Sequence, residues 1–243
     1  MNKLYFVFIC FSISYGQNKI EFSDLQLTGQ SEILMVKNSE FNLLPQAAKA
    51  YKLMKSEALK DGVKIKIVSS FRSFIRQKEI WNRKFKKNDS IGLSVNENIY
   101  KIIEYSTIPG TSRHHWGTEI DIIDGNIEEE GDVLLTEKFY KNGPYVKLKK
   151  WLKKNSEKFG FYLVYTKNDK RKGFKYEPWH YSYAPISIDI LESFMKLDIL
   201  KVLSKNKVLG STYFTDEFIN YYKKSFLLDI NPELKKISAS KNW

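Results

Sequence analysis

Cysteine and histidine are the scarce residues of this sequence. One cysteine among 243 residues excludes a fold stapled by disulfides and a metal site built from cysteines. Because there are only three histidines, each can be considered individually as a metal ligand. The hydrophobic content of 42% excludes a mostly disordered chain, and a chain of this length can bury a core of its own.

Acidic residues are outnumbered by basic ones. Lys and Arg total 40 against 28 Asp and Glu, which gives a formal net charge of +12. A surface this basic favours an anionic partner, such as nucleic acid, an anionic membrane surface or a cell-wall polymer. The charge by itself does not choose among these three.

No apolar run in the sequence reaches the ~20 residues that span a bilayer. Near the start, eight apolar residues (4–11) follow one lysine and precede small residues at Ser14 and Gly16. This pattern predicts a secretory signal peptide over residues 1–16. A short membrane anchor and a lipoprotein site at Cys10 are alternatives that the short run and the large residue before Cys10 disfavour. We therefore expect export to the periplasm or cell envelope, with no stable membrane anchor.

Helical and strand patterns are mixed without regular alternation, which favours an α+β fold. One domain is expected over residues 17–185, with a C-terminal helical extension, 186–243, packed on it. Apolar spacing predicts helices at 45–59, 70–86, within 89–104, and at 146–159, 186–203 and 216–227, and strands at 63–68, 118–123, 161–165 and 174–176, the last two as a hairpin.

All three histidines lie in two short segments, SRHHWGTEID (112–121) and EPWH (177–180). A catalytic zinc site needs three nitrogen or oxygen ligands from the protein and one open position. His114, Asp121 and His180 supply two imidazoles and a carboxylate. No other part of the sequence offers such a set, so these three residues are the candidate metal ligands.

The spacing of the first segment constrains its shape. Residues seven positions apart on a strand point to opposite faces, so His114 must lie on a loop that precedes the strand with Asp121. Gly117 permits the bend between them. His115 is expected to be structural, because its side chain diverges from that of the neighbouring ligand.

Two further residues carry candidate chemistry. Glu177 stands three residues before His180, and Pro178 fixes the turn between them. A carboxylate beside a bound metal can take a proton from water and pass it to a leaving amine. Arg72 follows a predicted strand, where a guanidinium can clamp a carboxylate, although an ordinary surface arginine is an equal alternative.

These segments resemble the VanY-like D-alanyl-D-alanine carboxypeptidases, zinc peptidases of peptidoglycan that are related to L,D-carboxypeptidases and to the hedgehog-type fold. The family pattern Ser-x-His-x-x-Gly-x-Ala-x-Asp is met by residues 112–121 except at Glu119, and Glu-x-Trp-His is met by residues 177–180. The family's Phe-Arg-Ser is met by residues 71–73, with Gln77 four residues on. Three motifs in the right order make the match specific.

The resemblance implies a small, largely antiparallel sheet flanked by helices, with a metal in a cleft. It implies Zn²⁺ as the cofactor, bound by His114, Asp121 and His180. Its other implied roles are Glu177 as general base, Arg72 as a catalytic and substrate-binding contact, and Ser112 and Gln77 as substrate-binding residues.

Glu119 departs from the family pattern, which has alanine at this position. On a strand it shares the face of Asp121. It could be a partner of a metal ligand, an extra ligand, or a contact for a substrate amine. The sequence leaves these three alternatives open.

The function implied by the resemblance is removal of the C-terminal D-alanine from peptidoglycan stem peptides by an exported protein, expected to be a monomer without a nucleic-acid partner. A zinc endopeptidase that cuts within the stem peptide is the nearer alternative. A non-catalytic cell-wall-binding module predicts a missing base or ligand, and none is missing. The sequence does not distinguish a pentapeptide from a tetrapeptide substrate.

Overall fold

The centre of the molecule is a four-stranded antiparallel sheet in the order β3-β4-β6-β5. The structure, a computed structural model, describes residues 21–235, so the expected signal peptide and Cys10 lie outside the described residues. The expected α+β fold with a small antiparallel sheet is confirmed. Its strands are β3 (Ile65–Ser69), β4 (Glu119–Asp124), β5 (Phe161–Leu163) and β6 (His180–Tyr183).

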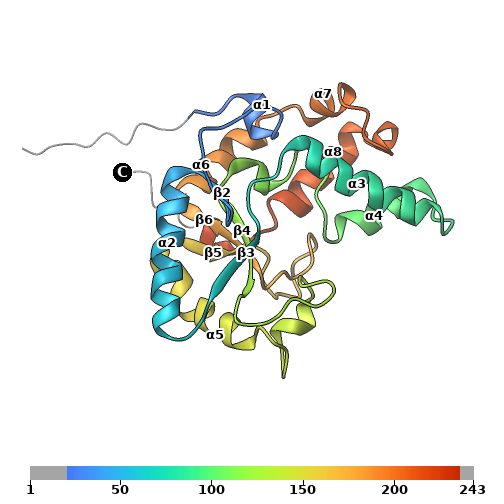
Figure 1. Ribbon diagram of the computed structural model, residues 1–243. Coiled ribbons are helices and arrows are strands. Elements are labelled where there is room, and N and C mark those ends of the chain that lie inside the picture. The colour runs from blue at the N-terminus through green and yellow to red at the C-terminus, as the bar shows by residue number, and fades with distance from the viewer. Residues whose placement is uncertain (1–20, 236–243) are drawn as a thin grey trace, which may run out of the picture.

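Helices surround this sheet (Figure 1), with α2 on one side and with α3 and α4 projecting on the other. A small antiparallel ribbon of β1 (Val36–Lys37) and β2 (Asn42–Leu43) lies near the N-terminal end. The helices are α1 (Asp24–Leu27), α2 (Pro45–Lys60), α3 (Phe74–Asp89), α4 (Val95–Ile103), α5 (Val146–Asn155), α6 (Ala184–Met195), α7 (Ile199–Ser204) and α8 (Asp216–Tyr222). Short 3-10 turns are η1 (Arg113–Trp116), η2 (Thr136–Phe139), η3 (Ser156–Phe159) and η4 (Ser211–Tyr213), and a π-type turn, η5 (Lys223–Leu227), continues α8.

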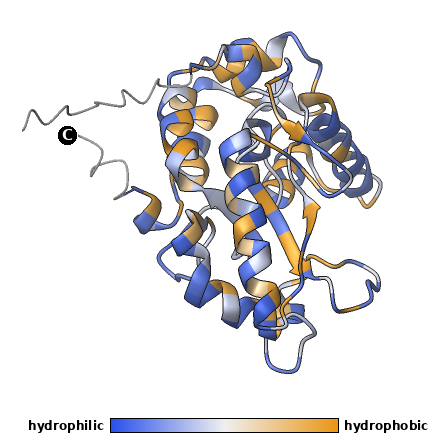
Figure 2. Cartoon of the chain, turned by 60° about the vertical axis from the view of Figure 1, so that its left-hand side comes forward, coloured by the Kyte–Doolittle hydropathy of each residue, from blue (hydrophilic) through white to orange (hydrophobic). Residues whose placement is uncertain are grey.

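Helix α2 illustrates how the sequence places an element. Pro45 opens the helix at a position where its missing N–H is not needed. Tyr51 is buried and donates a hydrogen bond from its hydroxyl to the carbonyl of Ile65 at the start of β3. Figure 2 shows the resulting division of the helices into hydrophobic and hydrophilic sides around the hydrophobic central strands. The buried stripe of α2 recurs every three or four residues and consists of Ala47, Ala48, Tyr51, Met54 and Ala58.

The register of the sheet aligns residues from three distant parts of the sequence. Asp121 of β4 pairs with Ser69 of β3 on one side and with His180 of β6 on the other. Two residues away, Glu119 pairs with Ser182. The sheet therefore places Ser69, which lies three residues before Arg72, in one row with Asp121 and His180.

One expected element is wrong. Residues 174–176 form no strand, and the partner of β5 is β6, with Phe161 opposite Tyr183. The aromatic alternation at 174–176 reflects packing instead, because the Phe174 ring contacts Tyr165, Tyr222 and Phe226. The hairpin prediction had the right first strand and the wrong second one.

The C-terminal helices differ in detail from the prediction. The helix expected at 186–203 is two helices, α6 and α7, and the side chain of Asp198 caps the second by accepting from the Lys201 amide. The buried Tyr222 hydroxyl accepts a hydrogen bond from the Ile108 amide at 3.2 Å and lies 3.0 Å from the Thr111 hydroxyl. Helix α8, which ends at Tyr222, thus packs against the loop that leads into η1. The boundary of the C-terminal extension stays a prediction.

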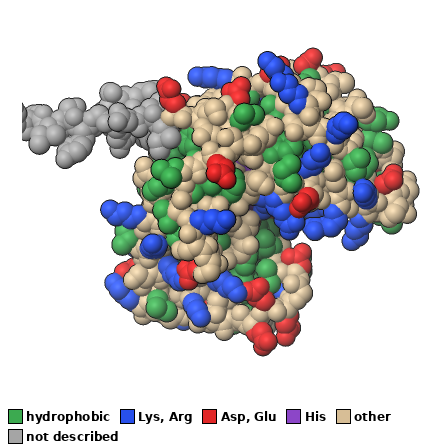
Figure 3. Space-filling view, turned by 45° about the horizontal axis from the view of Figure 1, so that its top comes forward, with side chains coloured by type: hydrophobic (Ala, Val, Ile, Leu, Met, Phe, Trp, Pro, Cys, Tyr) green, Lys and Arg blue, Asp and Glu red, His purple; other side chains and the backbone are tan. Residues whose placement is uncertain are grey.

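Within residues 21–235, no helix combines the length and the apolar content needed to cross a bilayer. Figure 3 shows the surface hollowed between the end of the molecule formed by α3 and α4 and the part below it.

Candidate metal centre and substrate pocket

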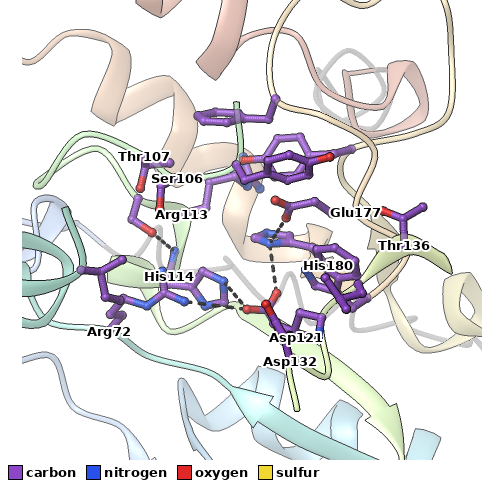
Figure 4. A pocket seen from close by; sticks show the side chains of 18 of the residues that line it. Arg72, Ser106, Thr107, Arg113, His114, Asp121, Asp132, Thr136, Glu177 and His180 are labelled. Carbon is purple, nitrogen blue, oxygen red and sulfur yellow. Dashed lines mark hydrogen bonds and ion pairs between the residues drawn. The ribbon is translucent and has the colours of Figure 1, made fainter. Parts of the chain in front are cut away.

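The three candidate ligands meet at one end of the sheet (Figure 4). Asp121 lies on β4, His180 begins β6, and His114 lies in the turn η1 just before β4. Their ligand atoms all lie within 4.8 Å of one another, and all three side chains are buried. Among residues 21–235 this is the group that could hold a metal ion.

The backbone geometry of η1 explains the position of His114. The side chain of Ser112 caps this turn by accepting a hydrogen bond from the His114 amide. Gly117 ends the turn with a φ of 67°, which favours glycine, and a Cβ there would lie 2.9 Å from the Met35 sulfur. The expected bend at Gly117 is confirmed.

Each candidate histidine has one ring nitrogen engaged and the other turned toward Asp121. His114 Nδ1 donates to the Ser70 carbonyl at 2.7 Å, and its Nε2 lies 3.2 Å from Asp121 Oδ2. His180 Nε2 donates to Glu119 Oε2 at 3.1 Å, and its Nδ1 lies 3.2 Å from Asp121 Oδ1. Such outer partners fix the orientation of metal-binding imidazoles in proteins.

This donor set fits a zinc ion. Two imidazole nitrogens and one carboxylate are a common catalytic zinc set that leaves a position open. Asp121 Oδ1 is buried and accepts no hydrogen bond, so a ligand atom is left without a partner at the point where the two rings converge. Burial would raise the pKa of Asp121, but the His114 and His180 imidazoles lower it below its ordinary value, which keeps it ionised.

Glu177 lies beside this group without belonging to it. Its Oε2 is 3.4 Å from His180 Nδ1, and the side chain borders the same pocket. The backbone holds it there, because its amide donates to the Tyr165 carbonyl and its carbonyl accepts from the His180 amide. The carboxylate is therefore close enough to exchange a proton with a molecule bound at the centre.

The residues expected to bind substrate are also brought together. Ser73 caps α3, so the helix begins at Phe74 rather than at residue 70, and Arg72 stays in the extended segment before it. Arg72 donates to Gln77 Oε1 and to Ser69 Oγ, both at 2.9 Å, and its Nη2 lies 3.8 Å from Asp121 Oδ2. The Ser112 and Arg72 side chains border the pocket, whereas Gln77 is buried behind it and also donates to the Thr107 carbonyl.

Glu119 contacts a candidate ligand from outside the centre. Besides His180, its carboxylate accepts from Ser182 Oγ at 2.7 Å and pairs with Arg113 Nη2 at 3.2 Å, and all of these side chains are buried. Burial would raise the pKa of Glu119, but the Arg113 guanidinium and the hydrogen bonds from His180 and Ser182 lower it to about 2. Of the three alternatives, the geometry matches a partner of a metal ligand.

His115 is separate from the centre, as expected. Its Nδ1 donates to the Arg72 carbonyl, and its Nε2 accepts from the Gly110 amide at 3.2 Å. Burial lowers the pKa of His115 to about 3, so the ring is neutral. Through its two hydrogen bonds, His115 connects the Arg72 segment to the loop before η1.

A cavity of about 540 Å³ opens over the centre. Its walls include residues that the sequence did not single out, among them Lys84 of α3, Tyr165, Asp132 and Glu137. Lys84 is seven positions from Gln77 on the same helix, a spacing from which it could have been found. The others lie in loops or, for Glu137, in the short turn η2, whose positions the sequence pattern does not give.

Comparisons with known proteins give the family of this chain. The family model of VanY, D-alanyl-D-alanine carboxypeptidase, matches residues 40–186, a span that contains every candidate site residue. The chain belongs to this family. A D-alanyl-D-alanine carboxypeptidase of Enterococcus faecalis is 30% identical over 128 residues, which cover 52% of this chain and 42% of that relative. The chain spans between 42% and 63% of the lengths of three curated relatives that it matches.

Two solved VanY structures share the fold. VanYB in complex with D-alanine-D-alanine has a TM-score of 0.53 at 23% identity, and the match covers 73% of this chain and 92% of that one. A D,D-pentapeptidase VanY from a VanB-type resistance cassette, in complex with Zn(II), has a TM-score of 0.52 at 21% identity, covering 76% and 92% of the two chains. At these identities the likeness shows the fold of the VanY family.

Proposed function

We propose that the protein is a zinc-dependent carboxypeptidase that removes the C-terminal D-alanine from peptidoglycan stem peptides. The observation that carries the proposal is the buried set of His114, Asp121 and His180, with Glu177 beside it in the wall of one pocket. Membership of the VanY family and the Enterococcus faecalis relative support it. A role in the cell envelope follows from this substrate, and the export signal stays a prediction at residues 1–16.

The proposed roles of the residues follow from their positions. His114 Nε2, His180 Nδ1 and Asp121 would hold the zinc. When bound, a zinc ion supplies positive charge that polarises a carbonyl group and lowers the pKa of water. Glu177 takes the proton from the attacking water, whose oxygen bonds to the carbonyl carbon, and returns that proton to the leaving amine as the C–N bond breaks.

The substrate group that Arg72 binds distinguishes an exopeptidase from an endopeptidase. Its guanidinium is partly buried and 3.8 Å from Asp121, so it can reach a group of the substrate next to the scissile bond. If that group is the terminal carboxylate, a substrate must end there. If it is the carbonyl oxygen of the scissile bond, the enzyme can also cut within a peptide.

We expect the unmutated protein to cleave a stem peptide with a free C-terminus about 10- to 100-fold faster, in kcat/KM, than the same peptide amidated at its C-terminus. The reason is that the amide removes a charge-assisted contact from Arg72. Arg72→Ala should lower activity on the free acid and narrow the gap between the two peptides. Steady-state kinetics of both proteins on both peptides measure this.

Other results would contradict this prediction or assign a different role to Arg72. Equal cleavage of the acid and the amide by the unmutated protein, or release of a dipeptide, would contradict a carboxypeptidase and favour an endopeptidase. A parallel loss on both peptides in Arg72→Ala would assign Arg72 to the scissile carbonyl. Arg76→Ala is the matched control, since Arg76 lies on the exposed side of α3 and pairs with Glu79.

A further inference from the structure

The pocket wall formed by α3 contains a second cation besides Arg72. Ile80 and Lys84 border the pocket, four positions apart on one face of the helix, and Gln77 lies one turn before Ile80. Lys84 is half-buried, and within residues 21–235 its ammonium makes no hydrogen bond or ion pair. Arg83 and Lys86, its neighbours on α3, are exposed to solvent.

A half-buried ammonium without a partner is unfavourable, because burial removes water that nothing replaces. Burial lowers the pKa of Lys84, and the Glu177 and Asp132 carboxylates oppose this without pairing with the ammonium. An anion in the pocket would supply the missing partner. Exposed lysines such as Lys86 have water instead and need none.

The other cations of the pocket are already engaged. Arg72 is held by Gln77, Ser69 and Asp121. Arg113 is held by Glu119 and stacks on the Trp116 ring, and its two nitrogen atoms without a hydrogen bond are covered by protein. Lys84 is therefore the cation of the described pocket that has no hydrogen bond or ion pair with the protein.

The charges of the pocket are segregated. Lys84 comes from α3, whereas Asp132 and Glu137 line the pocket from the segment between β4 and α5. Figure 3 shows Lys and Arg side chains along the upper edge of the hollow and Asp and Glu side chains on the part below it. A substrate group with a carboxylate and an ammonium side by side would match both walls.

Lys84 lies two turns along α3 from Gln77, the residue of this helix that holds Arg72. Gln77, which holds Arg72, lies seven residues from Lys84, or about 10 Å at 1.5 Å per residue. A residue of an extended peptide spans about 3.3–3.6 Å. At this separation the anion at Lys84 can be a different group from the one that Arg72 reaches, and the amidated peptide in the test below distinguishes the two.

We propose that Lys84 is a substrate-binding residue that pairs with a carboxylate on the side chain of the stem peptide's diamino acid. The protein would then prefer stem peptides whose diamino acid carries a carboxylate beside its distal amine, such as diaminopimelate, over those with lysine. The inference rests on the proposed function, because it names the substrate class of that same site.

The test uses two tetrapeptides that end in D-alanine and differ only in diaminopimelate or lysine at the third position. The unmutated protein should favour the diaminopimelate peptide. Lys84→Met, which keeps an unbranched side chain but removes the ammonium, should lower kcat/KM on that peptide about tenfold and leave the lysine peptide nearly unchanged. Lys86→Met on the exposed side of α3 should behave as the unmutated protein on both.

Equal losses on both peptides in Lys84→Met would overturn the proposal. So would a loss that disappears when the C-terminus is amidated, because the carboxylate would then be the terminal one. Affinities of both peptides for Glu177→Gln, with and without Lys84→Met, give the same comparison without turnover. An affinity difference that Lys84→Met removes, together with no turnover by the unmutated protein, would support the role of Lys84 and refute the proposed hydrolysis. Turnover by the unmutated protein without an affinity difference would refute the role of Lys84 alone.

Discussion

Glu177→Gln is expected to lower kcat about 10²- to 10⁴-fold while the protein keeps its metal, because an amide of nearly the same shape cannot accept a proton. Glu177 lies 3.4 Å from His180 Nδ1 and is 7% exposed, so the substitution removes a proton acceptor without opening a cavity. Single-turnover kinetics and metal analysis of the same preparation measure both quantities.

Near-normal turnover by Glu177→Gln would place the base elsewhere. Glu119 would then be the first residue to test, although its carboxylate is turned toward His180 Nε2, Arg113 and Ser182 rather than toward the pocket. Loss of the metal together with turnover would instead mean that Glu177 is a ligand. Glu79→Gln, at an exposed carboxylate of α3 that does not line the pocket, is a matched control for the loss of a negative charge.

His180→Ala is expected to abolish stable zinc binding, from one ion per chain in the unmutated protein. The reason is that the substitution removes one of the three proposed ligands, whose Nδ1 lies 3.2 Å from Asp121 Oδ1. Glu119→Ala should show a smaller effect, a 10- to 100-fold lower zinc affinity, because it removes only the acceptor that orients His180. Competition with a chromophoric chelator measures the affinities of all three proteins.

His115→Ala is the control for this series, because His115 contacts the backbone of Arg72 and Gly110 and no candidate ligand side chain. Its folded fraction should retain one zinc per chain. Full zinc occupancy in His180→Ala would refute the assigned ligand set. So would loss of zinc from folded His115→Ala alone.

The candidate site could be named from the sequence because its chemistry is carried by short segments. The residue types at 112–121 and 177–180 identify two imidazoles, a carboxylate and a base. Their geometry could not be predicted, because it depends on the long-range register that sets Asp121 opposite His180. Which nitrogen of each ring faces Asp121 depends in turn on Ser70 and Glu119, which lie on other segments.

The fold was predictable where apolar periodicity is strong and local. Helices α2 and α5 and strands β3 and β4 lie close to their expected positions. Strand β6 was missed because it is four residues long and starts inside the EPWH segment. The false strand at 174–176 arose because buried aromatic residues produce the same alternation when they pack against helices, as Phe174 does against Tyr222 and Phe226.

The products formed from whole stem peptides test the central proposal most directly. Purified protein would be incubated with pentapeptide and tetrapeptide muropeptides, and the products identified by mass spectrometry beside those of Glu177→Gln. We expect at least one of the two peptides to lose a single alanine residue, with free D-alanine released, and Glu177→Gln to leave both peptides intact over the same period. Release of a dipeptide, cleavage inside the stem, or two unchanged peptides in the presence of a zinc-loaded unmutated protein would contradict the central proposal.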